Sequence, residues 1–171
     1  HRAIDWINAV FAYAAHFNED RSRLFDLLMT GLRDMRTESD GLTDRVAATI
    51  GFRLPPGFDV VALERFVRDA AANAQVEFRG RETAHEEPRT SRAARALVSA
   101  IRESGGKPAL KLKTGTADMN VVAPIWKCPI VAYGPGDSTL DHTPNEHISL
   151  EEYLKAIRVL ERAIPKLLGS D

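Results

Sequence analysis

Cysteine, long apolar runs and net charge are all scarce in this sequence. Its 171 residues include one cysteine, Cys128, which excludes an internal disulfide and leads us to expect a reducing, cytoplasmic location. No apolar run approaches the roughly 20 residues of a membrane-spanning helix, and no secretory signal peptide is recognised near the start. A formal net charge of −1 excludes a strongly basic protein that coats nucleic acid. We therefore expect neither a membrane nor a nucleic acid as a partner.

The first half of the chain alternates helical and extended patterns. Residues 3–17 carry apolar side chains at spacings of three and four, which predicts a helix with one apolar face. Residues 24–37 follow no clean period. Residues 44–54 alternate between apolar and polar side chains and predict a half-buried strand. The turn-forming pair Asp40-Gly41 lies between these two segments, so we expect a hairpin here.

A helix and a further strand are expected after the hairpin. Pro55-Pro56-Gly57 ends the strand, and Asp59 is a suitable N-cap for a helix over residues 60–70. Residues 74–81 alternate again, which predicts a strand. This order of elements is that of a ferredoxin-like βαββαβ sandwich without its first strand, and an open sheet of this kind leaves backbone groups unpaired or invites a partner. We assign this α+β domain to residues 1–84.

The second half is predicted to be a separate α/β region over residues 85–171. It begins with a polar, proline-containing boundary at residues 85–90. Helices are expected from Ser91 to Glu103 and from Ser149, an N-cap residue, to about Leu168. Short strands are expected at residues 110–113 and 129–133.

Two glycine-containing loops in this region carry the candidate functional residues. The first is Lys113-Thr-Gly-Thr-Ala-Asp-Met-Asn120, where Gly115 allows a ligand to approach the backbone and polar side chains can bind a carboxylate or carbonyl. The second runs from Tyr133 to Glu146 and contains His142 beside Asp141, a pattern compatible with a metal-ligating imidazole. Taken alone, the first loop is also explained by a plain turn, and the second by a solvent-exposed histidine.

Together the two loops resemble a known enzyme family. The segments Leu110-Lys-Leu-Lys-Thr-Gly-Thr-Ala-Asp-Met-Asn120 and Tyr133-Gly-Pro-Gly-Asp-Ser-Thr-Leu-Asp-His-Thr-Pro-Asn-Glu-His147 resemble the C-terminal part of dinuclear-metal amidohydrolases of the aminoacylase and carboxypeptidase type. The resemblance is strongest to the branch that releases lysine or ornithine from an N-acylated form or from a small amino-group carrier protein. Upstream, residues 37–46 and 51–57 resemble the inserted lid of these enzymes, a βαββαβ sandwich that forms dimers.

The resemblance implies a metal site that this sequence carries only in part. Enzymes of this family hold two Zn²⁺ or Co²⁺ ions per subunit, and His142 matches the one ligand that their C-terminal part supplies. The other ligands and the general-base glutamate have no counterpart here, so no catalytic residue is assigned to this chain. We expect the chain alone to retain metal poorly and to be inactive, because each zinc ion needs about four ligands.

The resemblance also implies a set of substrate-binding residues and one residue that acts in the active site of the partner subunit. Gly115, Thr116, Asn120 and Gly134 match substrate-facing positions, with Asn120 standing where succinyl-specific relatives carry arginine. His1 is a candidate for the lid histidine that supports the oxyanion in the partner subunit's site. A tag remnant or a lost loop explains His1 equally well.

Three functional hypotheses remain open from the sequence. The first is an acetyl-lysine deacetylase-like hydrolase that releases lysine or ornithine, acting on an acyl-amino acid or a carrier protein as a homodimer. The second is another acyl-amino-acid deacylase or dipeptidase of the same family. The third is a non-catalytic domain that dimerises or binds a small ligand.

Overall fold

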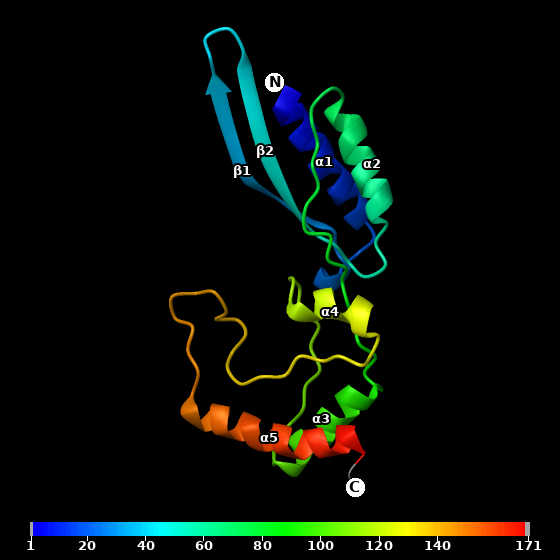
Figure 1. Cartoon of the computed structure of the whole chain (residues 1–171), viewed down its shortest axis with the longest axis vertical. Coiled ribbons are helices and arrows are strands. Elements are labelled where there is room, and N and C mark those ends of the chain that lie inside the picture. The colour runs from blue at the N-terminus through cyan, green and yellow to red at the C-terminus, as the bar shows by residue number, and fades with distance from the viewer. Residues whose placement is uncertain (1, 170–171) are drawn as a thin grey trace. The chain divides into compact units, whose positions relative to one another are not determined.

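The computed structural model describes residues 2–169 and divides the chain into two compact units. The first unit comprises His1–Ala84 with Leu112–Ala117, and the second comprises His85–Lys111 with Asp118–Asp171. The regular elements are five α-helices, one short 3₁₀ turn (Leu24–Asp26) and a single two-stranded sheet among the described residues. The protein is therefore of mixed α and β structure (Figure 1).

The first unit packs two helices against one end of a β-hairpin. Helix α1 (Arg2–Asn18) and helix α2 (Val60–Ala71) bury a core of Val10, Leu63 and Val67. The buried residues of α1 are Ile7, Val10 and Ala14, and those of α2 are Leu63 and Val67, so each helix presents one apolar face at helical spacing. Aromatic and aliphatic side chains surround them: Trp6, Tyr13, Ile50, Phe52, Leu54, Phe58, Phe66, Val76 and Phe78.

The hairpin consists of β1 (Met29–Ser39) and β2 (Asp44–Arg53), paired antiparallel from Met29 opposite Arg53 to Ser39 opposite Asp44. A register shift lies between Leu32 and Asp34. In the turn, the Asp40 carboxylate accepts hydrogen bonds from the backbone N–H groups of Leu42 and Thr43 at 2.9 and 2.7 Å. The predicted hairpin is present, and its β1 residues beyond Gly31 are exposed as the two strands extend past the helices (Figure 1).

The strand expected at residues 74–81 is not formed. This segment is irregular, although Val76 and Phe78 still pack against the first-unit core. The alternating pattern thus identified the buried face correctly. A strand also needs a neighbouring strand to accept and donate its backbone hydrogen bonds, and only β1 and β2 are paired in the described part of the chain.

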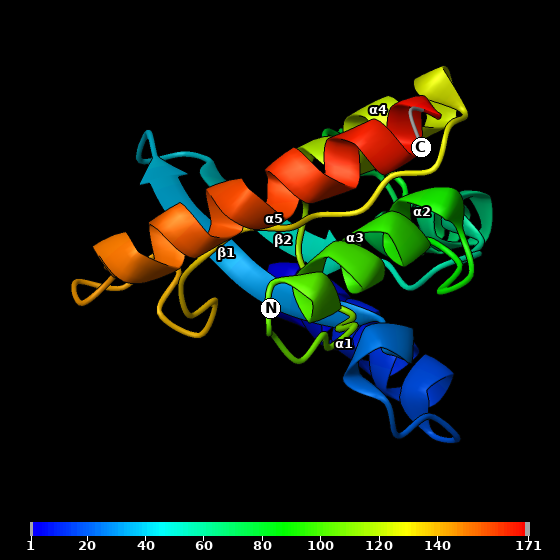
Figure 2. The same ribbon diagram turned by 90° about the horizontal axis from the view of Figure 1, so that it is seen from below.

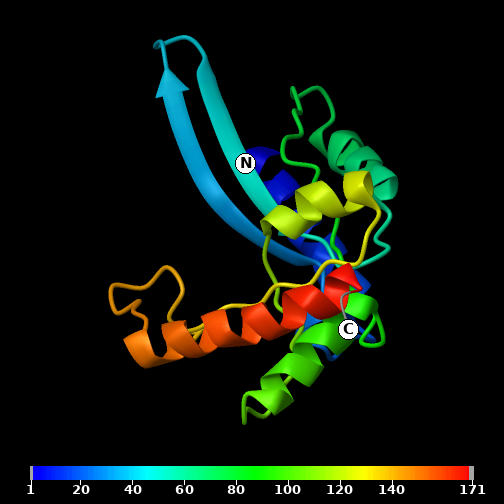
Figure 3. The ribbon, with the colours of Figure 1, turned by 60° about the horizontal axis from the view of Figure 1, so that its bottom comes forward.

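The second unit is built on two helices that lie side by side (Figures 2 and 3). Helix α3 (Arg92–Glu103) and helix α5 (Leu150–Leu168) meet through Ala100, Val159 and Ala163. Alanine at the contact allows the two helix backbones to approach closely, and Leu97, Ile101 and Tyr133 pack around it. The Lys166 ammonium also bonds the Glu103 carboxylate at 3.0 Å.

The remaining segments of the second half of the chain differ from the expected α/β pattern. Helix α4 (Asp118–Trp126) is present, with Pro124 inside it. Residues 110–113 and 129–133 form no strand. The reason is the one given for residues 74–81, since no partner strand is paired with them among residues 2–169. None of the described helices combines the length and the apolar character needed to cross a lipid bilayer.

Candidate functional site

The loop around His142 is a series of tight turns. The Leu140 N–H donates to the Asp137 carbonyl at 3.0 Å, the Thr143 N–H to the Leu140 carbonyl at 3.0 Å, and the Glu146 N–H to the Thr143 carbonyl at 3.1 Å. The Thr143 hydroxyl adds a bond of 2.7 Å to the same Leu140 carbonyl. These bonds are local, so the segment keeps a defined course without forming a helix or strand.

His142 stands at the centre of these turns in an uncommon backbone conformation. Its φ is 64°, in the left-handed region that residues with a Cβ seldom occupy. Its backbone N–H donates to the Glu146 carboxylate at 2.8 Å. The His142 side chain is exposed, so the imidazole is accessible to a ligand.

Asp137 begins the same series of turns and is held in its ionised form. Hydrogen bonds from the Thr139 backbone N–H, 2.9 Å away, and from the Thr139 hydroxyl lower the pKa of the Asp137 carboxyl below its ordinary value. The nearby charges of Lys111 and His147 lower this pKa further. Asp137 therefore acts here as an anionic anchor for the turn.

The other predicted binding residues divide between the two units. Gly115 and Thr116 are exposed and belong to the 112–117 stretch of the first unit, where Gly115 has a φ of 120° that favours glycine. Asn120 is half-buried in the first turn of α4, and Gly134 is exposed after the irregular segment 129–133; both belong to the second unit with His142. His1 lies outside the described residues.

The donor groups of the described residues do not make up a metal centre. Within residues 2–169, no three His, Cys, Asp or Glu side chains lie close enough to hold a metal ion. A zinc site in a protein uses about four ligands. The described residues therefore do not form a metal site by themselves.

Glu87 is a half-buried acid in the polar boundary at residues 85–90, to which the sequence assigned no function. Its side chain is 11% exposed. Its carboxylate lies 3.3 Å from His85 Nε2 and accepts the Ile130 N–H at 3.3 Å. Burial raises the pKa of Glu87, but hydrogen bonds from Ser91, Ile130 and His85 outweigh this and hold the pKa below its ordinary value. Glu87 thus links the start of the second unit to the segment before Gly134.

Comparison with known protein families shows to which family the chain belongs. Residues 9–166 match peptidase family M20/M25/M40. The chain belongs to this family. The match runs through the residue 37–57 region, both glycine-containing loops and His142, which are the segments that carried the resemblance.

The chain is also similar to individual curated members of this family. Over 148 residues the chain is 48% identical to the "[LysW]-lysine hydrolase" of Deinococcus radiodurans, covering 85% of this chain and 41% of that relative. Over 73 residues it is 47% identical to the "[LysW]-lysine/[LysW]-ornithine hydrolase" of Sulfurisphaera tokodaii, covering 43% of this chain and 21% of that relative. The chain thus spans less than half the length of these curated relatives.

Proposed function

We propose that this M20/M25/M40 chain is the C-terminal portion of an amide hydrolase that releases lysine or ornithine from an amino-group carrier protein or from an N-acylated form. The observation that carries the proposal is the 48% identity over 148 residues to a protein named "[LysW]-lysine hydrolase". The Sulfurisphaera tokodaii relative is named "[LysW]-lysine/[LysW]-ornithine hydrolase", which adds ornithine to lysine as a candidate product. A small carrier protein is accordingly the proposed partner, with acyl-amino acids as alternative substrates.

His142 is the residue we assign to metal binding in the whole protein. Imidazole is a common ligand of Zn²⁺ and Co²⁺, and the exposed His142 side chain is held by the turns of residues 137–146. Since the described residues hold no metal by themselves, the remaining ligands are proposed to come from sequence outside this chain. On this proposal the isolated chain does not hydrolyse the amide.

Gly115, Thr116, Asn120 and Gly134 are the proposed substrate-binding residues. Gly115 and Gly134 are exposed, and a Cβ built on either would meet no atom within 4 Å. That open space supports a role in ligand approach, since a glycine kept only for internal packing would be crowded. His1 is retained as the proposed oxyanion-supporting residue of a dimer.

Residues 1–84 are proposed to be the lid and dimerisation domain, and residues 85–171 the C-terminal part of the catalytic domain. The order of α1, β1, β2 and α2 is that of a ferredoxin-like lid without its first strand, and residues 74–81, which are irregular, follow at the place of the last strand. The Tyr153, Leu154 and Ile164 side chains of helix α5 are 50%, 53% and 49% exposed. This apolar surface supports the proposal that further sequence of the whole protein covers α5.

The first experiment is the intact mass of the protein as its source cell makes it, followed by an assay of lysine release from the carrier-linked form. We expect a mass well above 18.9 kDa and release of lysine by that longer protein, with none by the 171-residue chain. His142→Ala in the longer protein should lower kcat/KM by about a hundredfold or more, because it removes a metal ligand. It should also lower the zinc content measured by elemental analysis.

His147→Ala is the matched control, since His147 lies in the same exposed loop and its ring nitrogen lies 2.7 Å from the Asn145 carbonyl oxygen. It should leave zinc content and kcat/KM near those of the unaltered protein. A native mass of 18.9 kDa without amide hydrolysis would overturn the proposal and favour a non-catalytic binding domain. Equal loss of zinc in both variants would overturn the assignment of His142.

A further inference from the structure

Positive charge is concentrated in one stretch of this nearly neutral chain. Residues 88–117 contain seven lysines and arginines and one acid, Glu103, in a chain with totals of 23 basic and 24 acidic residues. Such an asymmetry indicates a local basic surface that could bind an anionic partner, although the net charge of the whole chain is close to zero.

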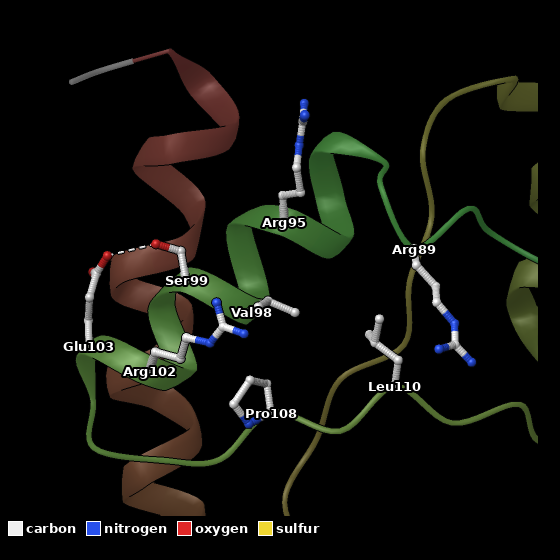
Figure 4. A pocket seen from close by; sticks show the side chains of 8 residues that line it. All are labelled: Arg89, Arg95, Val98, Ser99, Arg102, Glu103, Pro108 and Leu110. Atoms are coloured by element: carbon white, nitrogen blue, oxygen red, sulfur yellow. Dashed lines mark hydrogen bonds between the residues drawn. The ribbon is translucent and has the colours of Figure 1, made fainter.

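The structure gathers part of this stretch around an open pocket in the second unit. The pocket has a volume of about 660 Å³ and lies between α3 and the segment that follows it. Val98, Pro108 and Leu110 supply its apolar surface, and Arg89, Arg95 and Arg102 contribute cationic side chains. Figure 4 shows Arg102 and Arg89 on opposite sides of Pro108 and Leu110, with Arg95 extending away from them.

The acid that lines the pocket, Glu103, forms no ion pair with these arginines. Glu103 accepts a hydrogen bond from Ser99 at 2.7 Å and from Lys166 at 3.0 Å, and these partners lower the pKa of its carboxyl. Arg89, Arg95 and Arg102 are exposed and form no ion pair with another residue of the described chain. Their guanidinium groups thus remain available to an external anion.

We infer that this pocket binds an acidic segment of a partner protein, whose carboxylates pair with Arg89 and Arg102 and whose apolar side chain contacts Val98, Pro108 and Leu110. A planar guanidinium matches a carboxylate through two parallel hydrogen bonds. The separation of Arg89 and Arg102 by apolar residues suits a peptide that carries charge on either side of an apolar residue. The pocket contains no aromatic side chain on which a nucleic-acid base would stack.

This inference concerns a surface other than the loops of the proposed hydrolase site and does not depend on the proposed activity. Its test is the binding of a fluorescein-labelled peptide in which glutamates flank a single leucine, measured by anisotropy with the 171-residue chain. The Arg89→Ala/Arg102→Ala double variant should bind about tenfold more weakly, since each charged hydrogen-bond partner contributes to affinity. Affinity for the unaltered chain should also fall as salt is raised.

Two controls separate a specific site from general charge attraction. Arg158→Ala removes an exposed arginine of α5 that does not line the pocket, and it should leave the affinity unchanged. A peptide with serine in place of leucine should bind more weakly than the original. Arg102→Lys keeps the positive charge but lacks the planar guanidinium, and it should bind with intermediate affinity. It serves as the control for a loss of binding that is caused by misfolding.

Several outcomes would overturn the inference. The first is that the double variant binds the peptide as tightly as the unaltered chain. The second is that Arg158→Ala loses as much affinity as the double variant. The third is that the serine peptide binds as tightly as the leucine peptide. Tighter binding of a DNA oligonucleotide of the same charge would assign the surface to nucleic acid instead. Absence of binding by a longer form that carries the additional sequence found in the relatives would show that the pocket is covered in the whole protein.

Discussion

The backbone N–H of His142 donates to the Glu146 carboxylate at 2.8 Å while His142 holds a φ of 64°. The hydrogen bond spans four residues and closes the turn that presents the imidazole. A left-handed φ costs free energy for a residue with a Cβ. Glu146 therefore stabilises a conformation that the backbone of His142 would otherwise leave.

We predict that Glu146→Ala loosens this turn without unfolding the chain. One net hydrogen bond is worth about 1 kcal/mol, so hydrogen exchange at the His142 amide should accelerate roughly fivefold. Glu146→Gln keeps an acceptor oxygen at the same position and should retain most of the protection. Amide exchange followed by NMR measures both. Unchanged exchange in Glu146→Ala would show that the bond does not hold the turn.

We next predict that two valines of one helix differ sharply in their contribution to stability. Val67 is 3% exposed in the first-unit core, whereas Val61 is 69% exposed on the same helix α2. Val67→Ala should lower the free energy of unfolding by about 2 kcal/mol, from lost apolar burial and the cavity left behind. Val61→Ala should change it by less than about 0.5 kcal/mol. Urea denaturation of the two variants measures the difference, and equal effects would contradict the packing of α2.

Local sequence signals predicted helices α1, α2, α3 and α5 and the hairpin, because their hydrogen bonds form within short stretches, but they did not predict α4. The apolar stripe of residues 3–17 became α1, and Asp59 caps α2 by accepting the Ala62 N–H at 2.9 Å. The segment 24–37 gave no clean period. Most of it is nevertheless β1, whose outer residues are exposed on both faces, so burial imposed no alternation on them.

The expected strands at residues 74–81, 110–113 and 129–133 failed for a non-local reason. Alternation and apolar character report which side chains are buried, but a strand also requires a neighbour from a distant part of the sequence. The candidate site shows the same division. The turns around His142 depend on residues 137–146, whereas the surroundings of Glu87 join His85 to Ile130 across more than forty positions.

A further prediction concerns Asn18, at the end of α1. Its side-chain amide donates to the Leu28 carbonyl at 3.0 Å, and its carbonyl oxygen accepts the Leu28 N–H at 2.9 Å. Asn18→Asp keeps the acceptor but replaces the donor with an oxygen that faces the Leu28 carbonyl. The free energy of unfolding should fall by about 1–3 kcal/mol.

Asn8→Asp is the matched control for this change, because Asn8 is exposed on the same helix. It should alter the free energy of unfolding by no more than about 0.5 kcal/mol. Thermal and urea unfolding at neutral pH compare the two variants. If both lose stability equally, the effect is the added charge on α1 and the paired bonds to Leu28 contribute little.

The last prediction is a pH dependence of stability that arises from Glu87. Its folded-state pKa is lowered relative to the ordinary value, because hydrogen bonds from Ser91, Ile130 and His85 outweigh the effect of burial. A lowered folded pKa means that the unfolded chain takes up a proton first as pH falls. The contribution of Glu87 is therefore complete above the ordinary carboxyl pKa of 4.5 and is lost as pH falls through the lower folded value.

Glu87→Gln should accordingly destabilise the second unit at pH 7 and have a progressively smaller effect as pH falls below the ordinary carboxyl pKa of 4.5. Glu86→Gln changes the neighbouring acid, which is exposed, and should have little effect at any pH. Unfolding free energies of the unaltered chain and both variants, measured from pH 3 to pH 7, test this. A Glu87→Gln effect that stays constant over the whole range would mean that the carboxylate charge is not what joins residues 85–91 to Ile130.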